Sequence, residues 1–267
     1  MFKLYSEISA LGRFTNGHLT EFIDSIDSMQ WFEVDGGVAY ICPEKTDYYF
    51  GHAVNLYAAP ADDVAGKTLT ALWDAHLLEK ASKAHKRVVV WASEQFVDYK
   101  NINKEYNHQC EVMLKYSPTA NKISRPTYNV KKIKADDFAQ MADIYVADSG
   151  EVQRGFIEWM TGNRMDAIAA GVANFFAIWN QDRGEIASIA GLYWKDGVYR
   201  YASVATRKAY RGRGYASALI AYIRDYALER GAKELYIMAE NGSQAASIYK
   251  KTGFEIDSYM YSIVADR

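Results

Sequence analysis

The chain has 267 residues, of which 49% are hydrophobic and 24% are charged. This length suits one large or two modest domains, and the composition excludes a disordered, collagen-like or low-complexity chain. The 31 Lys and Arg residues nearly balance the 33 Asp and Glu residues, and the formal net charge of −2 excludes a bulk positive field that would hold nucleic acid or an anionic membrane.

The first part of the chain has its clearest secondary-structure signals after residue 51. Runs of branched and aromatic residues predict strands at 52–57 and 88–91, with a helix at about 68–86 between them. A short helix and a strand at 109–116 follow. This part of the sequence therefore predicts a strand, helix, strand unit.

A polar stretch between two prolines separates the two parts of the chain. Pro118 and Pro126 bracket residues rich in Asn, Lys, Ser and Arg, a composition typical of a linker. We therefore predict two domains, at residues 1–125 and 126–267.

The second part alternates helices and strands in a regular order. Its expected elements, in chain order, are a strand at 129–133, helices at 136–148 and about 154–170, strands at 175–179, 185–193 and 198–204, a helix at 214–230, a strand at 234–238, a helix at 243–252 and a strand at 260–264. The turn at Asp196-Gly197 favours a hairpin within an antiparallel meander. The sequence predicts the α+β class with a mixed sheet, and the shared element order of the two parts suggests a duplicated fold.

A turn with two glycines and two arginines lies between the strand that ends near Val204 and the helix that starts near Gly214. Its sequence is Arg211-Gly212-Arg213-Gly214-Tyr215-Ala216. Glycines let backbone N–H groups approach an anion closely, the helix N-terminus adds partial positive charge, and arginines donate bidentate hydrogen bonds to phosphate oxygens. The pattern predicts a pyrophosphate-binding turn, with a glycine-rich turn and solvated arginines as the alternative.

A dinucleotide-binding fingerprint is a rival interpretation of the same turn, because Gly212 and Gly214 begin a Gly-x-Gly pattern. The third position of that pattern is Ser217 rather than glycine. In addition, residues 205–211 separate the strand from the first glycine, where a dinucleotide site requires an immediate turn. A nicotinamide enzyme is therefore the least favoured class.

Two motifs carry a resemblance to a known family. Val204-Ala205-Thr206, four further residues and the turn from Arg211 to Ala216 resemble the acyl-CoA-binding motif of the GNAT superfamily of N-acetyltransferases, whose Arg-x-x-Gly-x-Ala core they match. The segment 241–254 resembles the second signature of that family, with its Asn, Ala, Tyr and Gly-Phe. The resemblance covers about residues 128–267.

The resemblance implies a GNAT-like mixed, mostly antiparallel central sheet flanked by helices, as a tandem of a degenerate and an intact copy. The run from Tyr48 to Gly51, followed by a strand and Ala-Ala-Pro, is similar to the degenerate first half of two-domain members. The Arg-x-x-Gly-x-Ala core is absent there, so the first half is not expected to bind CoA.

The resemblance also assigns roles to individual residues. The backbone of Val204 and Thr206 is expected to pair with the pantetheine amides, and a backbone N–H there to polarise the acetyl carbonyl. Tyr249 matches the general acid that serves the departing CoA thiolate, with a core tyrosine as the alternative. No metal is required. The residues assigned to the acyl-CoA carrier are Val204, Ala205, Thr206, Arg211, Gly212, Arg213, Gly214, Tyr215, Ala216, Asn241 and Ser243.

A general base has no clear candidate. An acceptor ammonium must lose a proton before it attacks, and many relatives are thought to use a strand carboxylate through water. The strand 198–204 contains no carboxylate. Glu151 and Glu240 are nearby carboxylates, but each reads more simply as a solvated or capping residue, and the amine can arrive deprotonated through ordered water.

The leading hypothesis is an acetyl-CoA-dependent N-acetyltransferase that transfers an acyl group directly to a primary amine of a small molecule or peptide. A non-catalytic acyl-CoA-binding or regulatory module is the alternative. The N-terminal residues have no signal-peptide pattern, and the most apolar stretch, 167–179, is shorter than the ~18 residues of a membrane span. With only Cys42 and Cys110, we expect a cytoplasmic protein without a disulfide or a metal. From the net charge and the short apolar stretch, we expect no membrane or nucleic-acid partner.

Overall fold

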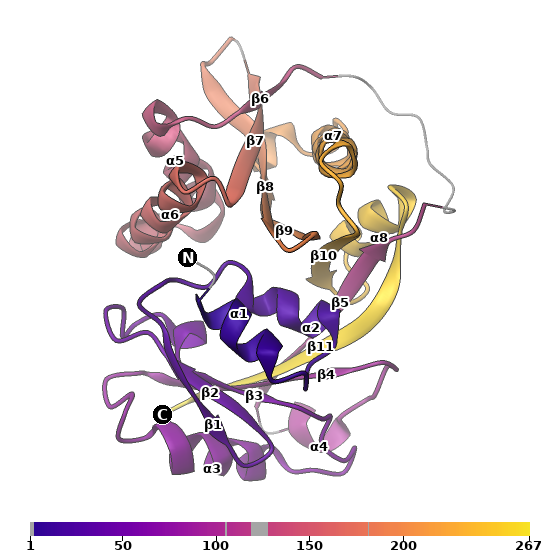
Figure 1. Ribbon diagram of the computed structural model, residues 1–267. Coiled ribbons are helices and arrows are strands. Elements are labelled where there is room, and N and C mark those ends of the chain that lie inside the picture. Colours follow the sequence, from indigo (N-terminus) through magenta and orange to yellow (C-terminus); the bar gives the residue numbers. More distant parts are fainter. Residues whose placement is uncertain (1–2, 105, 119–127, 181) are drawn as a thin grey trace. The chain divides into compact units, whose positions relative to one another are not determined.

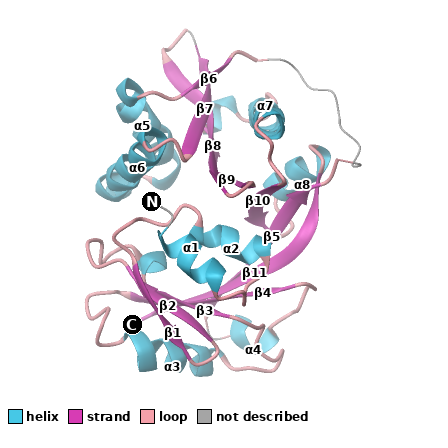
Figure 2. Ribbon diagram, in the orientation of Figure 1, coloured by secondary structure: helices cyan, strands magenta, loops and turns pink. Residues whose placement is uncertain are grey.

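The structure is a computed structural model that describes residues 3–104, 106–118, 128–180 and 182–267. Its contacts divide the chain into two compact units. Unit 1 contains Leu114–Ile237 and Ser247–Glu255, and unit 2 contains the residues up to Met113 together with Met238–Ala246 and Ile256–Arg267. The predicted boundary at residues 125 and 126 lies outside the described residues. Both units combine helices with strands (Figure 2).

Unit 2 is built on a sheet in which the last strand of the chain joins strands from the first part. Its strands in spatial order are β1 (Gln30–Val34), β2 (Gly37–Ile41), β3 (Ala53–Leu56), β4 (Lys86–Ser93) and β11 (Phe254–Asp266). Only the β3–β4 pair in this set is parallel. Figure 1 shows helices on both faces, namely α1 (Lys3–Ala10) and α2 (Asn16–Leu19) on one and α3 (Gly66–Leu77) and α4 (Lys100–Asn103) on the other.

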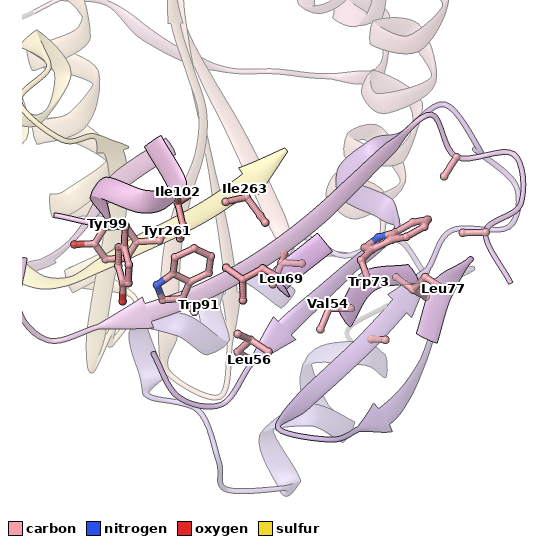
Figure 3. Close-up of a cluster of buried hydrophobic side chains, with 14 residues drawn as sticks. Val54, Leu56, Leu69, Trp73, Leu77, Trp91, Tyr99, Ile102, Tyr261 and Ile263 are labelled. Atoms are coloured by element: carbon pink, nitrogen blue, oxygen red, sulfur yellow. The ribbon is translucent and has the colours of Figure 1, made fainter. Parts of the chain in front are cut away.

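The core of unit 2 lies between its sheet and helix α3 (Figure 3). Trp73 and Leu77 of α3, Val54 of β3 and Trp91 of β4 are fully buried and belong to this one cluster. The Trp73 indole N–H donates to the His52 carbonyl at 2.8 Å, so the burial of this large ring leaves no polar atom without a partner.

Helix α3 ends at Leu77, so the predicted helix over 68–86 is too long. Beyond it, the Arg267 side chain donates hydrogen bonds to the carbonyls of Leu78, Ala81 and Ser82 at 3.2, 3.1 and 2.6 Å. This distant guanidinium thus supplies donors to the carbonyls that follow the helix. The helices α1 and α2 and the strands β1 and β2 were not predicted from the sequence.

The strands of unit 1 belong to the same 11-stranded sheet and include one parallel pair. Its strands in spatial order are β10 (Glu234–Glu240), β9 (Val198–Thr206), β8 (Glu185–Lys195), β7 (Ala173–Asn180) and β6 (Val130–Lys132). Strand β5 (Asn107–Tyr116) begins in unit 2 and ends in unit 1. Figure 1 shows α5 (Phe138–Ser149) and α6 (Arg154–Ala169) on one face of β7 and β8, and α7 (Tyr215–Glu229) on the other.

The two units repeat one order of elements. Three antiparallel strands, a helix, and a strand parallel to the third appear as β1-β2-β3-α3-β4 and again as β7-β8-β9-α7-β10. The hairpin at Asp196-Gly197 has positive φ angles of 53° and 87°, as a two-residue type I′ turn requires. The α+β class, the mostly antiparallel sheet and the elements predicted between 129 and 252 are confirmed. Within the described ranges, no helix has the length and apolar character needed to cross a bilayer.

Candidate functional site

Strands β9 and β10 separate after a short stretch of parallel pairing. Their register runs from the pair Val198 and Glu234 to the pair Arg200 and Tyr236. Strand β9 continues to Thr206 and stays paired with β8 on its other side. In the described part of the chain, residues 201–206 of β9 therefore have no strand partner on the β10 side. A free strand edge of this kind can pair with an extended chain of amides.

A β-bulge interrupts β9 within this free segment. The register with β8 shifts between the pairs Gly191–Ala202 and Ile189–Ala205, and Ser203 has a φ of 53° in the left-handed region. A non-glycine residue rarely adopts this conformation unless its surroundings hold it there. The bulge takes the backbone groups of Ser203 and Val204 out of the regular ladder with β8.

Two side chains from α5 and α6 hold the bulge. The Tyr145 hydroxyl donates to the Ser203 carbonyl at 2.8 Å, and the Arg164 guanidinium donates from Nη2 to the Ser203 hydroxyl at 2.7 Å. The Arg164 guanidinium also lies over the Tyr145 ring, 4.5 Å from its centroid. Burial raises the pKa of Tyr145 to about 12, so its hydroxyl remains a donor at neutral pH.

The turn before α7 exposes backbone donors at a helix N-terminus. Gly212 and Gly214 have φ angles of 78° and 82°, which glycine adopts without strain. No side chain caps the helix, and its first backbone bond runs from the Ala218 N–H to the Gly214 carbonyl. The N–H groups of residues 215–217 therefore have no helical acceptor. A Cβ built on Gly212 would meet nothing within 4 Å, so this face of the turn is open.

The two arginines of the turn have different surroundings. Arg213 lies with its guanidinium 5.4 Å from the Tyr210 ring centroid and has no carboxylate partner among the described residues. Arg211 donates from Nη2 to Asp148 at 2.8 Å and from Nε to the Thr206 carbonyl at 3.1 Å. Both members of the Arg211–Asp148 pair are about half exposed, so the pair contributes little stability and a phosphate can compete for the guanidinium.

Tyr249 lies on α8 (Gln244–Lys251) in unit 1, with 4% of its surface exposed. Its hydroxyl has no hydrogen-bond partner in the described part of the chain, and burial raises its pKa to about 12. The Tyr249 phenol lies close enough to Tyr201 of β9 to add to the effect of burial in raising the pKa of Tyr201. Tyr249 is therefore a protonated, uncommitted donor near the free segment of β9.

The other residues assigned to the carrier have structural contacts of their own. The Ser188 hydroxyl donates to the Ala205 carbonyl and forms a second hydrogen bond, of 2.8 Å, with the Thr206 hydroxyl. Ser243 caps α8, since its hydroxyl accepts the Ala246 N–H at 3.2 Å. Asn241 and Ser243 belong to unit 2, whereas the Arg211–Ala216 turn and Tyr249 belong to unit 1.

Glu151, one of the two candidate bases, and Tyr201 of β9 are engaged in other contacts. Glu151 accepts hydrogen bonds from Arg154, which lowers the pKa of that carboxyl and makes it a weaker base. Tyr201 is buried and donates to the Ile220 carbonyl at 2.7 Å. Sequence reasoning missed Tyr145, Arg164 and Ser203, and no local sequence signal marks them. Among the residues the structure describes, no three His, Cys, Asp or Glu side chains are grouped to hold a metal.

The corresponding helix N-terminus in unit 2 is covered rather than open. Helix α3 begins at Gly66, and a Cβ built there would overlap the ring of Tyr106. Strand β3 also ends at Leu56, one residue after its pairing with β4 stops at Asn55. The helix terminus and the free strand segment that unit 1 offers to a ligand thus have no counterpart in the described part of unit 2.

In the comparisons with known proteins, the family match falls in the part of the chain that contains the Arg211–Ala216 turn and Tyr249. Residues 133–254 match the model of the acetyltransferase (GNAT) family. No curated protein matches the sequence significantly. The family match and the fold together point to acyl transfer from acetyl-CoA.

Solved structures share the fold over most of the chain. A functionally unknown conserved protein from Staphylococcus epidermidis has 12% identity and a TM-score of 0.65, over 91% of this chain and 96% of its own. A tandem GNAT protein from the clavulanic acid biosynthesis pathway has 11% identity and a TM-score of 0.60, over 94% and 87%. A GCN5-related N-acetyltransferase from Kribbella flavida has 16% identity and a TM-score of 0.58, over 89% of both chains. At these identities the likeness concerns the fold alone.

Proposed function

We propose that this protein is an N-acetyltransferase that moves an acetyl group from acetyl-CoA directly to a primary amine of a small molecule or peptide. The observation that carries the proposal is the separation of β9 from β10 beside the open N-terminus of α7. The free strand edge can pair with extended amides, and the open helix N-terminus can bind phosphates. A CoA molecule contains both groups, in its pantetheine arm and its pyrophosphate.

In this proposal the turn and the strand bind different parts of the carrier. The N–H groups of residues 212–217, with Arg213 and a released Arg211, bind the pyrophosphate. The free edge of β9 at Val204, Ala205 and Thr206 pairs with the pantetheine amides. Asn241 and Ser243 remain predicted contacts of the pantetheine arm. The open space beside Gly212 supports this assignment, because a phosphate can come close to the backbone only where no side chain intervenes.

The reaction requires polarisation of a carbonyl and a donor for the leaving sulfur. Acetyl-CoA supplies a thioester carbon, to which the amine nitrogen bonds as the carbon–sulfur bond breaks. A backbone N–H at the bulge, beside Ser203, donates to the carbonyl oxygen. Tyr249 donates its proton to the thiolate and recovers one from solvent. The ammonium loses one proton through water before the attack, and the nitrogen loses a second through water after it, since β9 carries no carboxylate over residues 198–204.

Thiol release from acetyl-CoA across a panel of amines tests the proposal, with acetyl-CoA binding measured by calorimetry. We expect turnover with at least one amine, and a kcat about 10- to 100-fold lower for Tyr249→Phe with acetyl-CoA affinity unchanged. Tyr222→Phe is the matched control, because Tyr222 is 42% exposed on α7 and its hydroxyl has no partner among the described residues. Equal rates for the wild type and Tyr249→Phe would contradict the role of Tyr249.

A non-catalytic acyl-CoA-binding module is the second candidate, favoured by the absence of a carboxylate on residues 198–204 and by the engagement of Glu151 with Arg154. The same experiment separates the two. Tight acetyl-CoA binding without thiol release on any amine would support the module, whereas thiol release that depends on the amine would support the enzyme.

A further inference from the structure

Arg164 is a half-buried cation at the bulge of β9. It reaches Ser203 from α6, with its Nη2 donating to the Ser203 hydroxyl at 2.7 Å. Its guanidinium carbon lies 4.5 Å from the centroid of the Tyr145 ring and 5.9 Å from that of Phe175. Both distances lie within the range of cation–π contacts. Within the described residues, its remaining N–H donors have no hydrogen-bond acceptor.

Arg164 also lacks a carboxylate partner, unlike four other arginines of unit 1. Arg154 contacts Glu151, Asp143 and Glu158, and ion pairs likewise join Arg207 to Glu185, Arg211 to Asp148, and Arg224 to Asp225. No Asp or Glu oxygen in the described part of the chain lies within 4.0 Å of the Arg164 side chain. A partly desolvated guanidinium without a counter-charge is unfavourable unless a ligand supplies one.

The position of Arg164 indicates which ligand would supply the negative charge. On the proposed function, the neutral thioester lies at the bulge, while the phosphates of the carrier bind at the Arg211–Ala216 turn, beyond the end of β9. The carrier thus offers no negative charge at Ser203. The other reactant that must approach the thioester carbon is the acceptor amine.

We propose that Arg164 binds a carboxylate of the acceptor, so that the acceptor is an amino acid or another amine with a carboxylate a few bonds from its amino group. This inference rests on the proposed function and names its substrate class. The planar guanidinium suits a carboxylate because two parallel N–H donors match its two oxygens. The contact orients the amine toward the carbon beside the bulge and adds no step to the reaction.

The test compares amino acids with their C-terminal amides, which keep the amine and replace the carboxylate by a neutral group. Because amidation also lowers the pKa of the amine, rates are compared per concentration of deprotonated amine. We expect the wild type to have a kcat/KM at least about tenfold higher for the preferred amino acid than for its amide. Arg164→Gln should bring this ratio close to one, and Arg164→Lys should retain part of it. Propionate should inhibit the wild type competitively against the amino acid, propionamide should not, and Arg164→Gln should be insensitive to both.

Arg230→Gln is the matched control. Arg230 also stacks on aromatic rings, those of Trp194 and Tyr226, and has no carboxylate partner among the described residues, but it lies at the end of α7 away from the bulge. This variant should keep the wild-type ratio.

Two results would overturn the inference while the proposed function stands. One is a wild type that acetylates amino acids and their amides equally well. The other is an Arg164→Gln variant that loses activity on both by the same factor, since a residue that only holds Ser203 would act in that way. If Arg164→Gln does not fold, the wild-type ratio and Arg164→Lys still decide the question. Failure of the wild type to bind acetyl-CoA would instead contradict the proposed function, and the inference with it.

Discussion

The Tyr145 hydroxyl donates a 2.8 Å hydrogen bond to the carbonyl of Ser203, the residue of β9 that lies in the left-handed region. This bond connects α5 to the bulge and orients the backbone groups on which carbonyl polarisation would depend. It joins residues 58 positions apart, so the bulge is a tertiary feature rather than a local one.

Removal of this hydroxyl should therefore weaken both stability and activity. Tyr145→Phe leaves the Ser203 carbonyl without its donor, and we expect a loss of about 1–2 kcal/mol in the free energy of unfolding. The kcat/KM should fall by a similar factor for charged and neutral acceptors, in contrast to Arg164→Gln. Urea unfolding and steady-state kinetics measure the two effects. A variant as stable and as active as the wild type would show that the bulge does not need this bond.

The pH dependence of kcat should reflect the raised pKa of Tyr249. A general acid must be protonated, and a phenol whose pKa burial raises to about 12 stays protonated well above pH 10. The rate at saturating substrate should rise as the amine loses its proton and then remain level to about pH 11. A descending limb centred at or below pH 10 in the wild type, and absent from Tyr249→Phe, would show that the phenol titrates at its ordinary value.

The sequence predicted unit 1 well because its signals are local. Glycines at 171, 197, 231 and 253 mark turns, and branched or aromatic runs between them mark strands. Unit 2 was harder because non-local contacts shape it. Arg267 binds the carbonyls that follow α3, and β4 pairs with β11 at the other end of the chain.

The residues of the candidate site show the same contrast between local sequence signals and non-local contacts. The Arg211–Ala216 turn and Tyr249 each follow from a motif of consecutive residues, and their roles stay predictions. Ser203 could not be singled out, because its bulge arises only from the register between β8 and β9. In the sequence, Arg164 is one charged residue among several on a predicted helix. Its contact with Ser203 depends on the bulge that this register creates.

The protonation of a buried histidine should make the stability of unit 2 depend on pH. His18 is 2% exposed and contacts the Asn55 side-chain oxygen at 3.2 Å, and burial lowers its pKa to about 4. Because the folded pKa lies below the unfolded value of about 6.5, its contribution is present above pH 6.5 and is lost as the pH falls toward 4. The expected loss over that window is about 3 kcal/mol.

Urea midpoints between pH 7 and pH 4 measure this dependence. His18→Gln removes the titrating group, so its stability should change less over the same window than that of the wild type. His76→Gln, at a partly exposed position on α3, should keep the wild-type dependence. Parallel curves for the wild type and His18→Gln would contradict the assignment.

The backbone conformation at Gly212 gives the sharpest test of the anion-binding turn. With a φ of 78°, an alanine there would be strained by about 1–2 kcal/mol although its Cβ meets no atom within 4 Å. Relaxation of that strain would rotate the N–H groups away from the anion, so Gly212→Ala should weaken acetyl-CoA binding at least about tenfold. Gly155→Ala in α6 is the matched control, because its Cβ also meets no atom but its φ is not positive, and it should be neutral or slightly stabilising. Calorimetry gives both affinities, and an unchanged affinity in Gly212→Ala would mean that the phosphates bind elsewhere.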